Sequence, residues 1–545
     1  MKKYIKHLMC FAAVSLVATT GCKKDFFNRP PEDAITVDNF YQTNDQVIAS
    51  TNALYNSPWF NWVGKSGWAI TELAGGNGRT YSDDVISLFN FSLTDINPRI
   101  ADAWNSLFTV VAQSNALINN LPVKASASVD KAILNNALGE AHLMRALAYF
   151  HIVRIWGNVP IIENSVDFVG NFQVNTNPVT DIYKFIINDL KFAEANCTPK
   201  IRAGASIAQG HVSSGSASAL LAKVYLYMDD YANARVEAEK VINSGEFKLY
   251  RGNITNDQIA QYGYTGLIDG KNYNDLFKTV NNNNEESVIA LQWAGGAAYG
   301  HGNPQQASFA IAGVTGTGDG YSVLGPTIDL QNAYEPGDTR LHGTIMKAGD
   351  FYPEINQAGG GFTVPASVNA QNTKAGIKKY VVGTPADNGG IGAAQSAANC
   401  TYMMRYAEVL LIAAESILGA NSSTNDVTAL KYYNMVRNRA GLAPVTSFTK
   451  TNMFHERRIE LAIEGDYWFD LERMDGWQGI LTVKHPKALA VIANQERGTY
   501  SNDTPPQVYS DKKTAKDAFF NFPIPQVETA TDPKLLDPPV PYKFK

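Results

Sequence analysis

The sequence predicts a mainly helical protein, in which tetratricopeptide-like helical repeats adjoin an irregular, loop-rich half with a few short strands. Apolar residues recur every three or four positions through most of 36–251 and again in 400–480, which is typical of amphipathic helices. The intervening stretch 252–399 is rich in glycine and asparagine and lacks this period. The chain has 545 residues, 45% of them hydrophobic and 18% charged, which is ample for a large core.

The clearest helical repeat spans 213–245, "SSGSASALLAKVYLYMDDYANARVEAEKVINSG". Two helices are predicted on either side of the turn "MDDY". The small residues Ala222 and Ala234 stand where paired helices must approach closely, and Leu221 and Tyr225 supply the large partners. This pattern is typical of a tetratricopeptide unit, and the preceding helical segments fit it more loosely.

The stretch 252–399 is predicted to fold as packed loops, because it retains Trp, Tyr and Phe among its glycines and so is not a linker. The short apolar runs "ESVIALQW" and "KKYVV" within it predict isolated strands. After the returning helices of 400–480, the proline-rich C-terminal region 481–545 is predicted to be extended.

The N-terminus predicts export and a lipid anchor. Residues 1–21 combine a basic start, a short apolar run and small residues before Cys22, as a secretory signal peptide does. The apolar run is too short to span a bilayer. We expect Cys22 to be lipidated and 22–35 to form a tether, although plain signal-peptidase cleavage nearby remains an alternative.

Charge and cysteine content exclude several classes of function. The net charge of −5 argues against a nucleic-acid partner. In the mature chain, Cys197 and Cys400 are far apart in sequence and no C-x-x-C is present, so no zinc cluster is predicted, and whether these two thiols pair is left open. No cofactor is predicted, and bound calcium is not readable from the sequence.

The segment "FHERRIELAIEGDYWF" invites comparison with a zinc-protease helix, but it lacks the second histidine, because Ile459 stands four residues after His455. Glu456, Glu460 and Glu464 recur at helical spacing with arginines between them. Glutamates stacked on one helix face repel one another unless cations pair with them. We therefore expect a structural ion-pair network here, and neither a metal site nor a catalytic residue.

The order of several motifs resembles the SusD/RagB outer-membrane lipoproteins of the Bacteroidetes over nearly the whole chain. The motifs are "KKDFFNRPP" after the cysteine, "GEAHLMRALAYFHIVRIWGNVPII", "SASALLAKVYLYMDDYANARVEAEKVI", "MMRYAEVLLIAAES", "FHERRIELAIEGDYWFDLERM" and "FPIPQVE". The resemblance implies one domain over 36–545. It would have four tetratricopeptide-like units as a scaffold in 36–251, an irregular ligand-binding half in 252–399 and returning helices in 400–480.

The same resemblance implies a non-catalytic protein anchored by lipid in the outer membrane and facing the exterior. It would bind an oligosaccharide or another nutrient and deliver it to a SusC-like TonB-dependent transporter, which the helical repeats would contact. Two alternatives stay open at this point. One is a surface glycoside hydrolase that uses two carboxylates, and the other is a protein-interaction scaffold without a small ligand.

Binding residues are inferred from the chemistry of sugars, whose apolar faces stack on exposed aromatic rings and whose hydroxyls bond to polar side chains. Two glycine-rich loops carry such groups, "GGNGRTYSDD" and the region from "WAGGAAYGHGNPQQ" to "GTGDGYS". The alternative is that each ring packs into its own loop, and Trp59, Trp62 and Trp68 are expected in the core. The candidates are Asn77, Arg79, Tyr81, Trp293, Tyr299, His301 and Tyr321.

Overall fold

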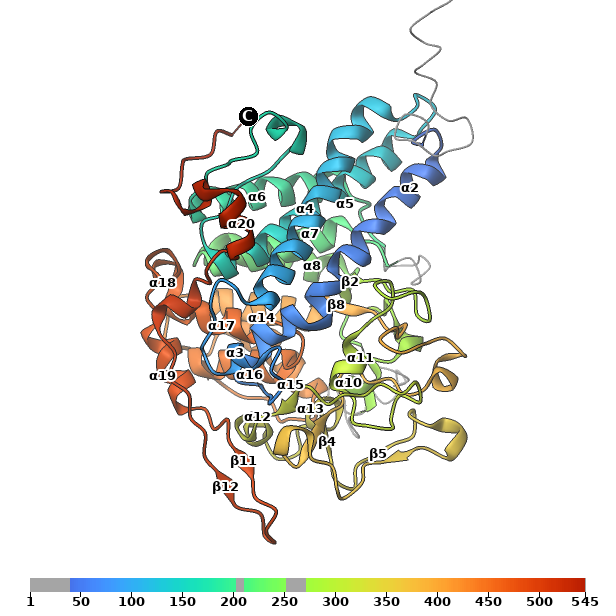
Figure 1. The fold of residues 1–545 in the computed structure, drawn as a ribbon, viewed down its shortest axis with the longest axis vertical. Helices are drawn as coiled ribbons and strands as arrows, with labels where there is room; N and C mark the ends of the chain where they lie inside the picture. The colour runs from blue at the N-terminus through green and yellow to red at the C-terminus, as the bar shows by residue number, and fades with distance from the viewer. Residues whose placement is uncertain (1–39, 202–209, 251–270, 545) are drawn as a thin grey trace, which may run out of the picture.

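The computed structural model describes residues 40–201, 210–250 and 271–544. Helices account for 52% of it, and the strands form short two-stranded sheets, so the predicted fold class is confirmed. Figure 1 shows the early helices in the upper half of the molecule and the loop-rich half at the lower right. The predicted signal peptide, Cys22 and the tether lie outside the described residues.

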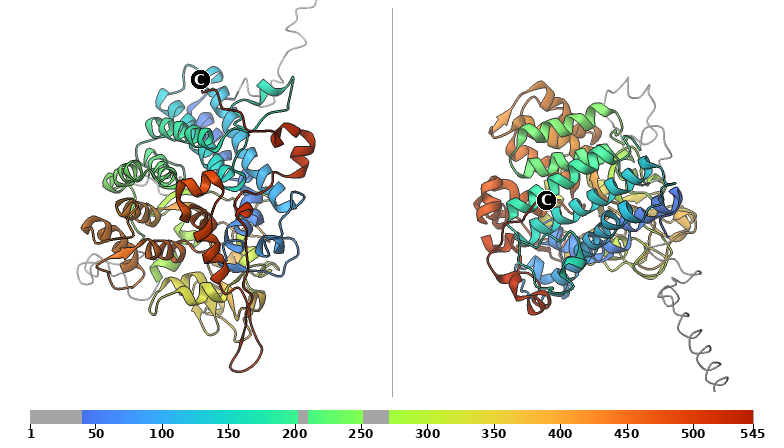
Figure 2. Two further views of the ribbon diagram at one scale, coloured as in Figure 1. Left: turned by 90° about the vertical axis from the view of Figure 1, so that its left-hand side faces the viewer. Right: turned by 90° about the horizontal axis from the view of Figure 1, so that it is seen from above.

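The helical scaffold is built from consecutive antiparallel neighbours. Each helix from α4 to α8 packs on the next, and α8 packs on α14, which then pairs with α15. Seen from above, these helices lie in adjacent rows (Figure 2). Their bounds are α2 (Asn44–Asn52), α4 (Pro98–Lys124), α5 (Lys131–Trp156), α6 (Val179–Asn196), α7 (Ser214–Tyr227), α8 (Tyr231–Ser244), α14 (Tyr406–Leu418) and α15 (Val427–Arg439).

The predicted repeat at 213–245 is confirmed as the pair α7 and α8. The Ser213 side chain caps α7 by accepting from the main-chain N–H of Ser216. α8 ends at Gly245, whose φ of 68° is a left-handed conformation that glycine adopts without a side-chain clash. Ala222 and Ala234 are fully buried between the two helices, as close helix approach requires.

The loop-rich half is held by short pairings rather than by a sheet. The predicted strand in "ESVIALQW" is confirmed as β2 (Ser287–Leu291), which pairs antiparallel with β8 (Thr401–Arg405). The other pairs are β1 (Gly78–Arg79) with β3 (Gly325–Pro326), β4 (Ile345–Lys347) with β7 (Ala375–Ile377), β5 (Phe351–Tyr352) with β6 (Phe362–Thr363), β9 (Ser423–Thr424) with β10 (Phe448–Thr449), and β11 (Thr499–Tyr500) with β12 (Val508–Tyr509).

The predicted strand in "KKYVV" is wrong. β7 ends at Ile377, and the chain then turns through Tyr380, whose φ is 65°. Two buried ion pairs hold this turn in place. The Lys378 ammonium pairs with Glu354, and the Lys379 ammonium pairs with Glu464. Burying two ammonium groups costs much free energy unless carboxylates pair with them. The local apolar run gave no sign of these distant partners, so the sequence predicted a strand.

Shorter helices complete the fold, and the C-terminal region departs from the predicted extended form because α19 and α20 lie within it. The helices not yet given are α3 (Ile86–Phe89), α10 (Lys271–Asp275), α11 (Gln305–Phe309), α12 (Ile328–Ala333), α13 (Arg340–Thr344), α16 (Lys450–Leu461), α17 (Tyr467–Glu472), α18 (Gly476–Thr482), α19 (Pro486–Asn494) and α20 (Gln526–Thr531). The hairpin of β11 and β12 projects from the body (Figure 1).

The core contains the three tryptophans expected there, Trp59, Trp62 and Trp68, all within the irregular helical segment 57–73. Cys197 and Cys400 are buried thiols in different parts of the fold. Within the described residues, no helix has the length and apolarity needed to cross a membrane.

The predicted ion-pair network is confirmed at the centre of the molecule. Glu460 on α16 lies between Arg405 at 2.8 Å, Arg340 at 3.2 Å and Arg439. Burial by itself raises the pKa of Glu460, but these three guanidinium groups lower it to about 2. One detail differs: α16 ends at Leu461, so Glu464 lies beyond the helix. It still pairs with Arg405, at 2.6 Å.

Candidate functional site

The structure divides six of the seven residues predicted to bind ligand into two groups, and the seventh, His301, is exposed. Tyr81, Tyr299 and Tyr321 expose 50%, 72% and 55% of their surface. Asn77, Arg79 and Trp293 are buried, and their polar atoms are engaged within the protein. Of these six, the three tyrosines can present a ring to a ligand in solution.

Tyr81 and Tyr321 are brought together by the short antiparallel pair of β1 and β3. Gly78 pairs with Pro326 and Arg79 with Gly325, so the residues after β1 run alongside those before β3. Gln371 fastens the two segments: its Oε1 accepts from the main-chain N–H of Tyr81 at 2.7 Å, and its Nε2 donates to the carbonyl of Ser322 at 2.6 Å. These two loops therefore form one surface.

Arg79 supports the Tyr81 ring from behind. Its guanidinium carbon lies 4.2 Å from the ring centre, a cation–π distance. The guanidinium is held in turn, because its Nε donates to the carbonyl of Arg497 at 3.0 Å and its Nη2 lies 3.7 Å from Asp511. Arg79 is thus a buried support for an exposed ring and does not itself face solvent.

The Asn77 side chain points into the protein and is hydrogen-bonded there. Its amide donates to Glu72 at 2.9 Å and its carbonyl oxygen accepts from Arg458 Nε at 2.8 Å. Burial raises the pKa of Glu72, and the hydrogen bond from Asn77 offsets part of that effect. Sequence reasoning placed Asn77 in a binding loop because of its glycine neighbours, but the tertiary contacts direct its side chain inward.

The second predicted region contributes Tyr299. Its ring packs edge-on against Phe60, with ring centres 4.8 Å apart. The exposed His301 accompanies it, with Nδ1 2.8 Å from the hydroxyl of Ser57. Trp293, by contrast, is 9% exposed and donates from Nε1 to Thr401 at 3.0 Å, so it serves as core beneath this loop.

The helical segment 57–73 and α11 support the loop that carries Tyr299 and the loop that carries Tyr321. The Ser308 hydroxyl on α11 donates to the Gly64 carbonyl at 3.3 Å, and the main-chain N–H of Tyr321 donates to the Ala307 carbonyl at 2.8 Å. Phe60, on which the Tyr299 ring packs, belongs to the same helical segment. We name the three exposed rings Tyr81, Tyr299 and Tyr321 the tyrosine face. Exposed aromatic rings on a rigid support are the usual means of binding the apolar face of a sugar.

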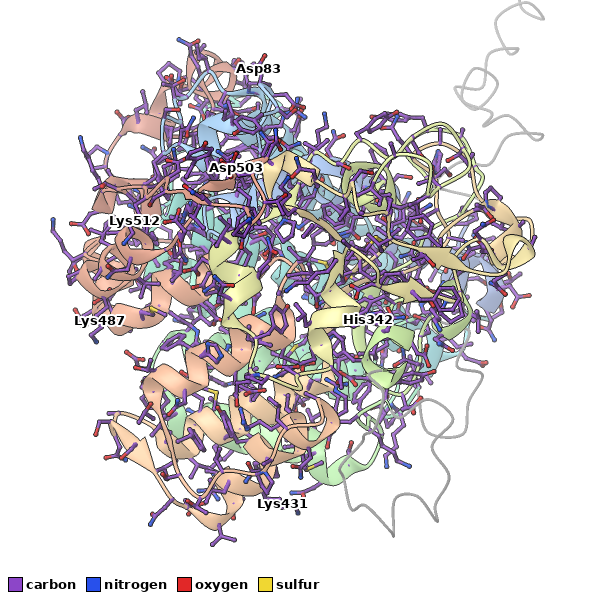
Figure 3. All side chains as sticks on the ribbon, turned by 90° about the horizontal axis from the view of Figure 1, so that it is seen from below. Asp83, His342, Lys431, Lys487, Asp503 and Lys512 are labelled. Atoms are coloured by element: carbon purple, nitrogen blue, oxygen red, sulfur yellow. The ribbon has the colours of Figure 1, made fainter. Side chains whose placement is uncertain are left out.

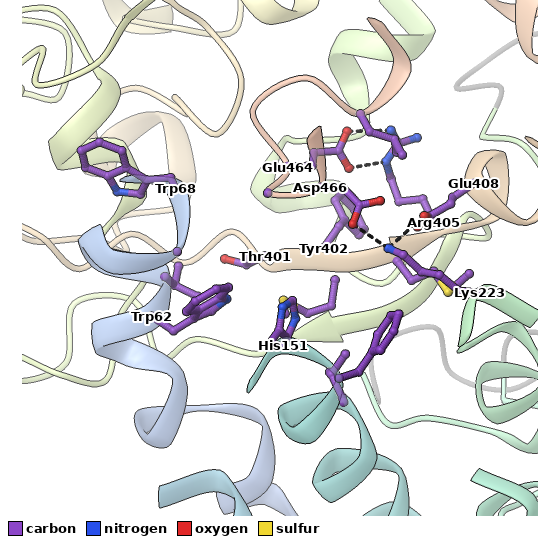
Figure 4. A pocket seen from close by; sticks show the side chains of 18 of the residues that line it. Trp62, Trp68, His151, Lys223, Thr401, Tyr402, Arg405, Glu408, Glu464 and Asp466 are labelled. Atoms are coloured by element: carbon purple, nitrogen blue, oxygen red, sulfur yellow. Dashed lines mark hydrogen bonds and ion pairs between the residues drawn. The ribbon is translucent and has the colours of Figure 1, made fainter. Parts of the chain in front are cut away.

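A cavity of about 50 Å³ lies in the interior, between the scaffold and the loop-rich half, and is too small for a sugar. Trp62 and His151 lie on one side of it and charged groups on the other (Figure 4). Lys223 pairs there with Asp466 at 2.8 Å and with Glu408 at 2.9 Å. Burial lowers the pKa of His151, which keeps its ring neutral. The space suits a few water molecules that bridge polar groups.

Sequence reasoning missed Gln371 and Phe60. Gln371 lies 290 residues from Tyr81, and its backbone φ of 52° gives no signal in the sequence. Phe60 stands in an apolar helical run and is indistinguishable there from ordinary core. Both matter only through contacts that folding creates between distant segments.

Comparison with known proteins agrees with this architecture. The family model described as the SusD family matches residues 285–539, and a second, described as starch-binding associating with outer membrane, matches 32–226. A SusD-like protein of Bacteroides ovatus is 31% identical over the whole of both chains. SusD-like protein P2 of Formosa agariphila is 25% identical over 85% of this chain and 89% of its own.

Solved structures give the same result. One determined with a xylogluco-oligosaccharide has a TM-score of 0.78 at 29% identity, covering 92% of this chain and 99% of its own. A laminarin-binding SusD-like protein has a TM-score of 0.66 at 23% identity over 90% of this chain and 98% of its own, a likeness of fold. Proteins of the SusD family bind glycans and are not catalytic. The full-length relative and the two family models together show that this chain belongs to the SusD/RagB family.

Proposed function

We propose that this protein binds an oligosaccharide on its tyrosine face, at the cell surface, and delivers it to a SusC-like TonB-dependent transporter of the outer membrane. The observation that carries the binding proposal is the arrangement of Tyr81 and Tyr321 on loops that Gln371 fastens together. A ring that is held rigidly loses little conformational entropy when a ligand stacks on it.

The ligand class rests on the chemistry of the face and on a relative. Three exposed phenol rings suit the apolar faces of neutral sugars, and no charge is needed to bind them. The solved relative at 29% identity was determined with a xylogluco-oligosaccharide. We therefore propose a neutral oligosaccharide, and the first probes are xyloglucan oligosaccharides and laminarin oligosaccharides, after the two solved structures named above.

Attachment to the membrane is proposed through lipid on Cys22, which the sequence supports and which lies outside the described residues. Several acyl chains hold a protein on a bilayer stably. We expect the mature protein to carry lipid and to fractionate with outer membranes, and Cys22→Ala to abolish both. Mass spectrometry of the N-terminal peptide measures this directly, and an unmodified Cys22 peptide in the mature protein would contradict the proposal.

Calorimetric titration of the mature chain with the two glycans tests the binding site. We expect saturable binding, weakened about tenfold, or about 1.4 kcal/mol, in each of Tyr81→Ala and Tyr321→Ala. Phe172→Ala is a matched control, because Phe172 is an exposed ring in another part of the fold. Equal loss in all three variants would show that the tyrosine face is not the site.

Two further outcomes separate the alternatives. Glycan that is shortened during long incubation would favour a hydrolase. Tight binding of the transporter with no binding of any glycan would favour a pure scaffold. Co-purification with the transporter, in the presence and absence of glycan, measures the delivery part of the proposal.

A further inference from the structure

An open groove of about 700 Å³ lies between α16 and α19, and none of its lining residues belongs to the tyrosine face. The volume falls within the range of small-molecule pockets, about 300 to 1,000 Å³. Lys487 marks the groove on α19 and lies at the edge of the molecule in the view from below (Figure 3).

Helical spacing builds the two walls. On α16, Lys450, Phe454 and Arg458 recur every four residues and so share one face of the helix. On α19, Lys487 and Val491 are likewise four apart. On α16 the apolar Phe454 therefore lies between two cations, and on α19 the apolar Val491 lies one turn after Lys487.

Among the residues that the structure describes, the lining contains no carboxylate. Carboxylates beside its cations are already engaged: Asp329 pairs with Arg458 at 2.7 Å, and Glu415 pairs with Arg473 at 2.7 Å and with Lys450 at 3.7 Å. Beside Lys487, the Asp475 carboxylate accepts from the main-chain N–H groups of Lys487 and Ala488, at 3.1 Å and 3.3 Å. These pairs leave little capacity to neutralise a further cation.

Two cationic groups keep spare hydrogen-bonding capacity. Among the described residues, the Lys487 ammonium has no carboxylate partner, and it donates only to the Met474 carbonyl, at 3.3 Å. The Arg458 guanidinium uses Nε for Asn77 and Nη1 for Asp329, and within the described part of the chain its Nη2 has no hydrogen-bond partner. Lys487 is exposed and Arg458 is buried, so the first stands at the mouth of the groove and the second at its inner end.

The half-buried His455 adds no charge at neutral pH. Burial is the largest cause that lowers its pKa, and Arg458 and Arg340 lower it further, while Glu456 and Glu335 act in the opposite direction. Its neutral ring adds flat surface beside the apolar wall. The groove thus combines apolar side chains with one ammonium group, that of Lys487, which pairs with no carboxylate of the described residues.

We propose that the groove between α16 and α19 binds a small organic acid made of one six-membered ring and one carboxylate. The ring packs on Phe454, Met474 and Val491, and the Lys487 ammonium binds the carboxylate. Aromatic acids and uronic acids share this chemistry. The proposal does not depend on the tyrosine face, because the two sites have no residue in common.

Titration of the full mature chain with benzoate and with D-glucuronate tests the proposal, using calorimetry and ligand-observed NMR. Benzyl alcohol and D-glucose serve as neutral counterparts. We expect saturable binding of at least one acid and none of its neutral counterpart. Binding of benzoate alone identifies an aromatic acid, and binding of glucuronate alone identifies a uronic acid.

Matched variants locate the site. Val491→Glu puts a negative charge into the groove and should abolish binding, and Lys487→Gln should weaken it about tenfold. Ala493→Glu puts the same charge on the exposed side of α19, outside the groove, and should leave binding intact. Tyr81→Ala should also leave it intact. Thermal unfolding checks that each variant is folded. No saturable binding of either acid, or binding that Val491→Glu leaves unchanged, overturns the proposal.

Discussion

Gln371 illustrates, at the scale of one residue, how a polar side chain can join the two loops of the tyrosine face, the surface we propose for binding. It bonds to the main chain on both sides of the surface, at Tyr81 and at Ser322. Through these two bonds it holds together the main-chain segments that carry Tyr81 and Tyr321. It is a positioning residue, and its role differs from that of the rings themselves.

The Gln371→Ala change should weaken glycan binding several-fold, because the Tyr81 and Ser322 segments lose their common partner. Losing these exposed and half-buried hydrogen bonds should also cost about 0.5–1.5 kcal/mol of unfolding free energy each. Calorimetry at a temperature where the variant remains folded separates the two effects. Gln357→Ala, at an exposed glutamine, is the control. Lower stability with unchanged affinity would refute the positioning role.

Trp293 belongs to the core although its loop reads as a binding loop. Trp293→Ala should lower the unfolding free energy by about 3–5 kcal/mol, because the substitution leaves a cavity and removes one hydrogen bond to Thr401. Denaturant unfolding measures this. Trp293→Phe keeps most of the packing and should cost less. If the alanine variant were as stable as the wild type, the tryptophan would not be packed as described.

Pairs of helices show, at the scale of elements, which features follow from local sequence. The period of α7 and α8 and the small residues between them are readable directly, and the structure confirms them. The end of α16 is not readable in this way. Ala462 leaves the helical region and Ile463 has a φ of 65°, although the apolar and acidic period continues beyond Leu461.

Ala234→Leu tests the packing of α7 on α8. The added methylenes have no room between the two helices, so we expect a loss of about 1–3 kcal/mol of unfolding free energy. Ala232→Leu, on the exposed side of the same helix, is the matched control and should be nearly neutral. Denaturant midpoints compare the two variants. Equal stabilities would mean that α7 and α8 are not closely packed.

The buried ion-pair network joins the parts of the whole molecule. Glu460 on α16 meets arginines from α13, β8 and α15, so one carboxylate connects elements separated widely in the chain. In a second group, Arg473 binds Glu415 at 2.7 Å. Despite the opposing effect of burial, Arg473 and Lys450 lower the pKa of Glu415 to about 2.

Acid should weaken the network in a defined range of pH. The pKa of Glu460 is about 2 when folded and about 4.5 when unfolded, so its contribution is fully present above pH 4.5 and is lost as the pH falls toward 2. Glu460→Gln should cost about 3–5 kcal/mol near pH 7, since it removes the carboxylate that three buried arginines share and leaves their positive charge less fully compensated. The difference in unfolding free energy from the wild type should shrink between pH 5 and pH 3. Denaturant titrations at several pH values measure it, and a constant difference would contradict the assignment.

By itself, the sequence determined the mainly helical class, the order of the segments, the repeat at 213–245 and the loops that carry the exposed tyrosines. These follow from local periodicity and composition, which neighbouring residues impose on one another. Tertiary structure decided which members of those loops face solvent. Tyr81 is exposed while Asn77 and Arg79 turn inward, because Glu72, Arg458, Arg497 and Asp511 hold their polar groups. Most of those partners come from segments hundreds of residues away, and only the packed chain brings them into reach.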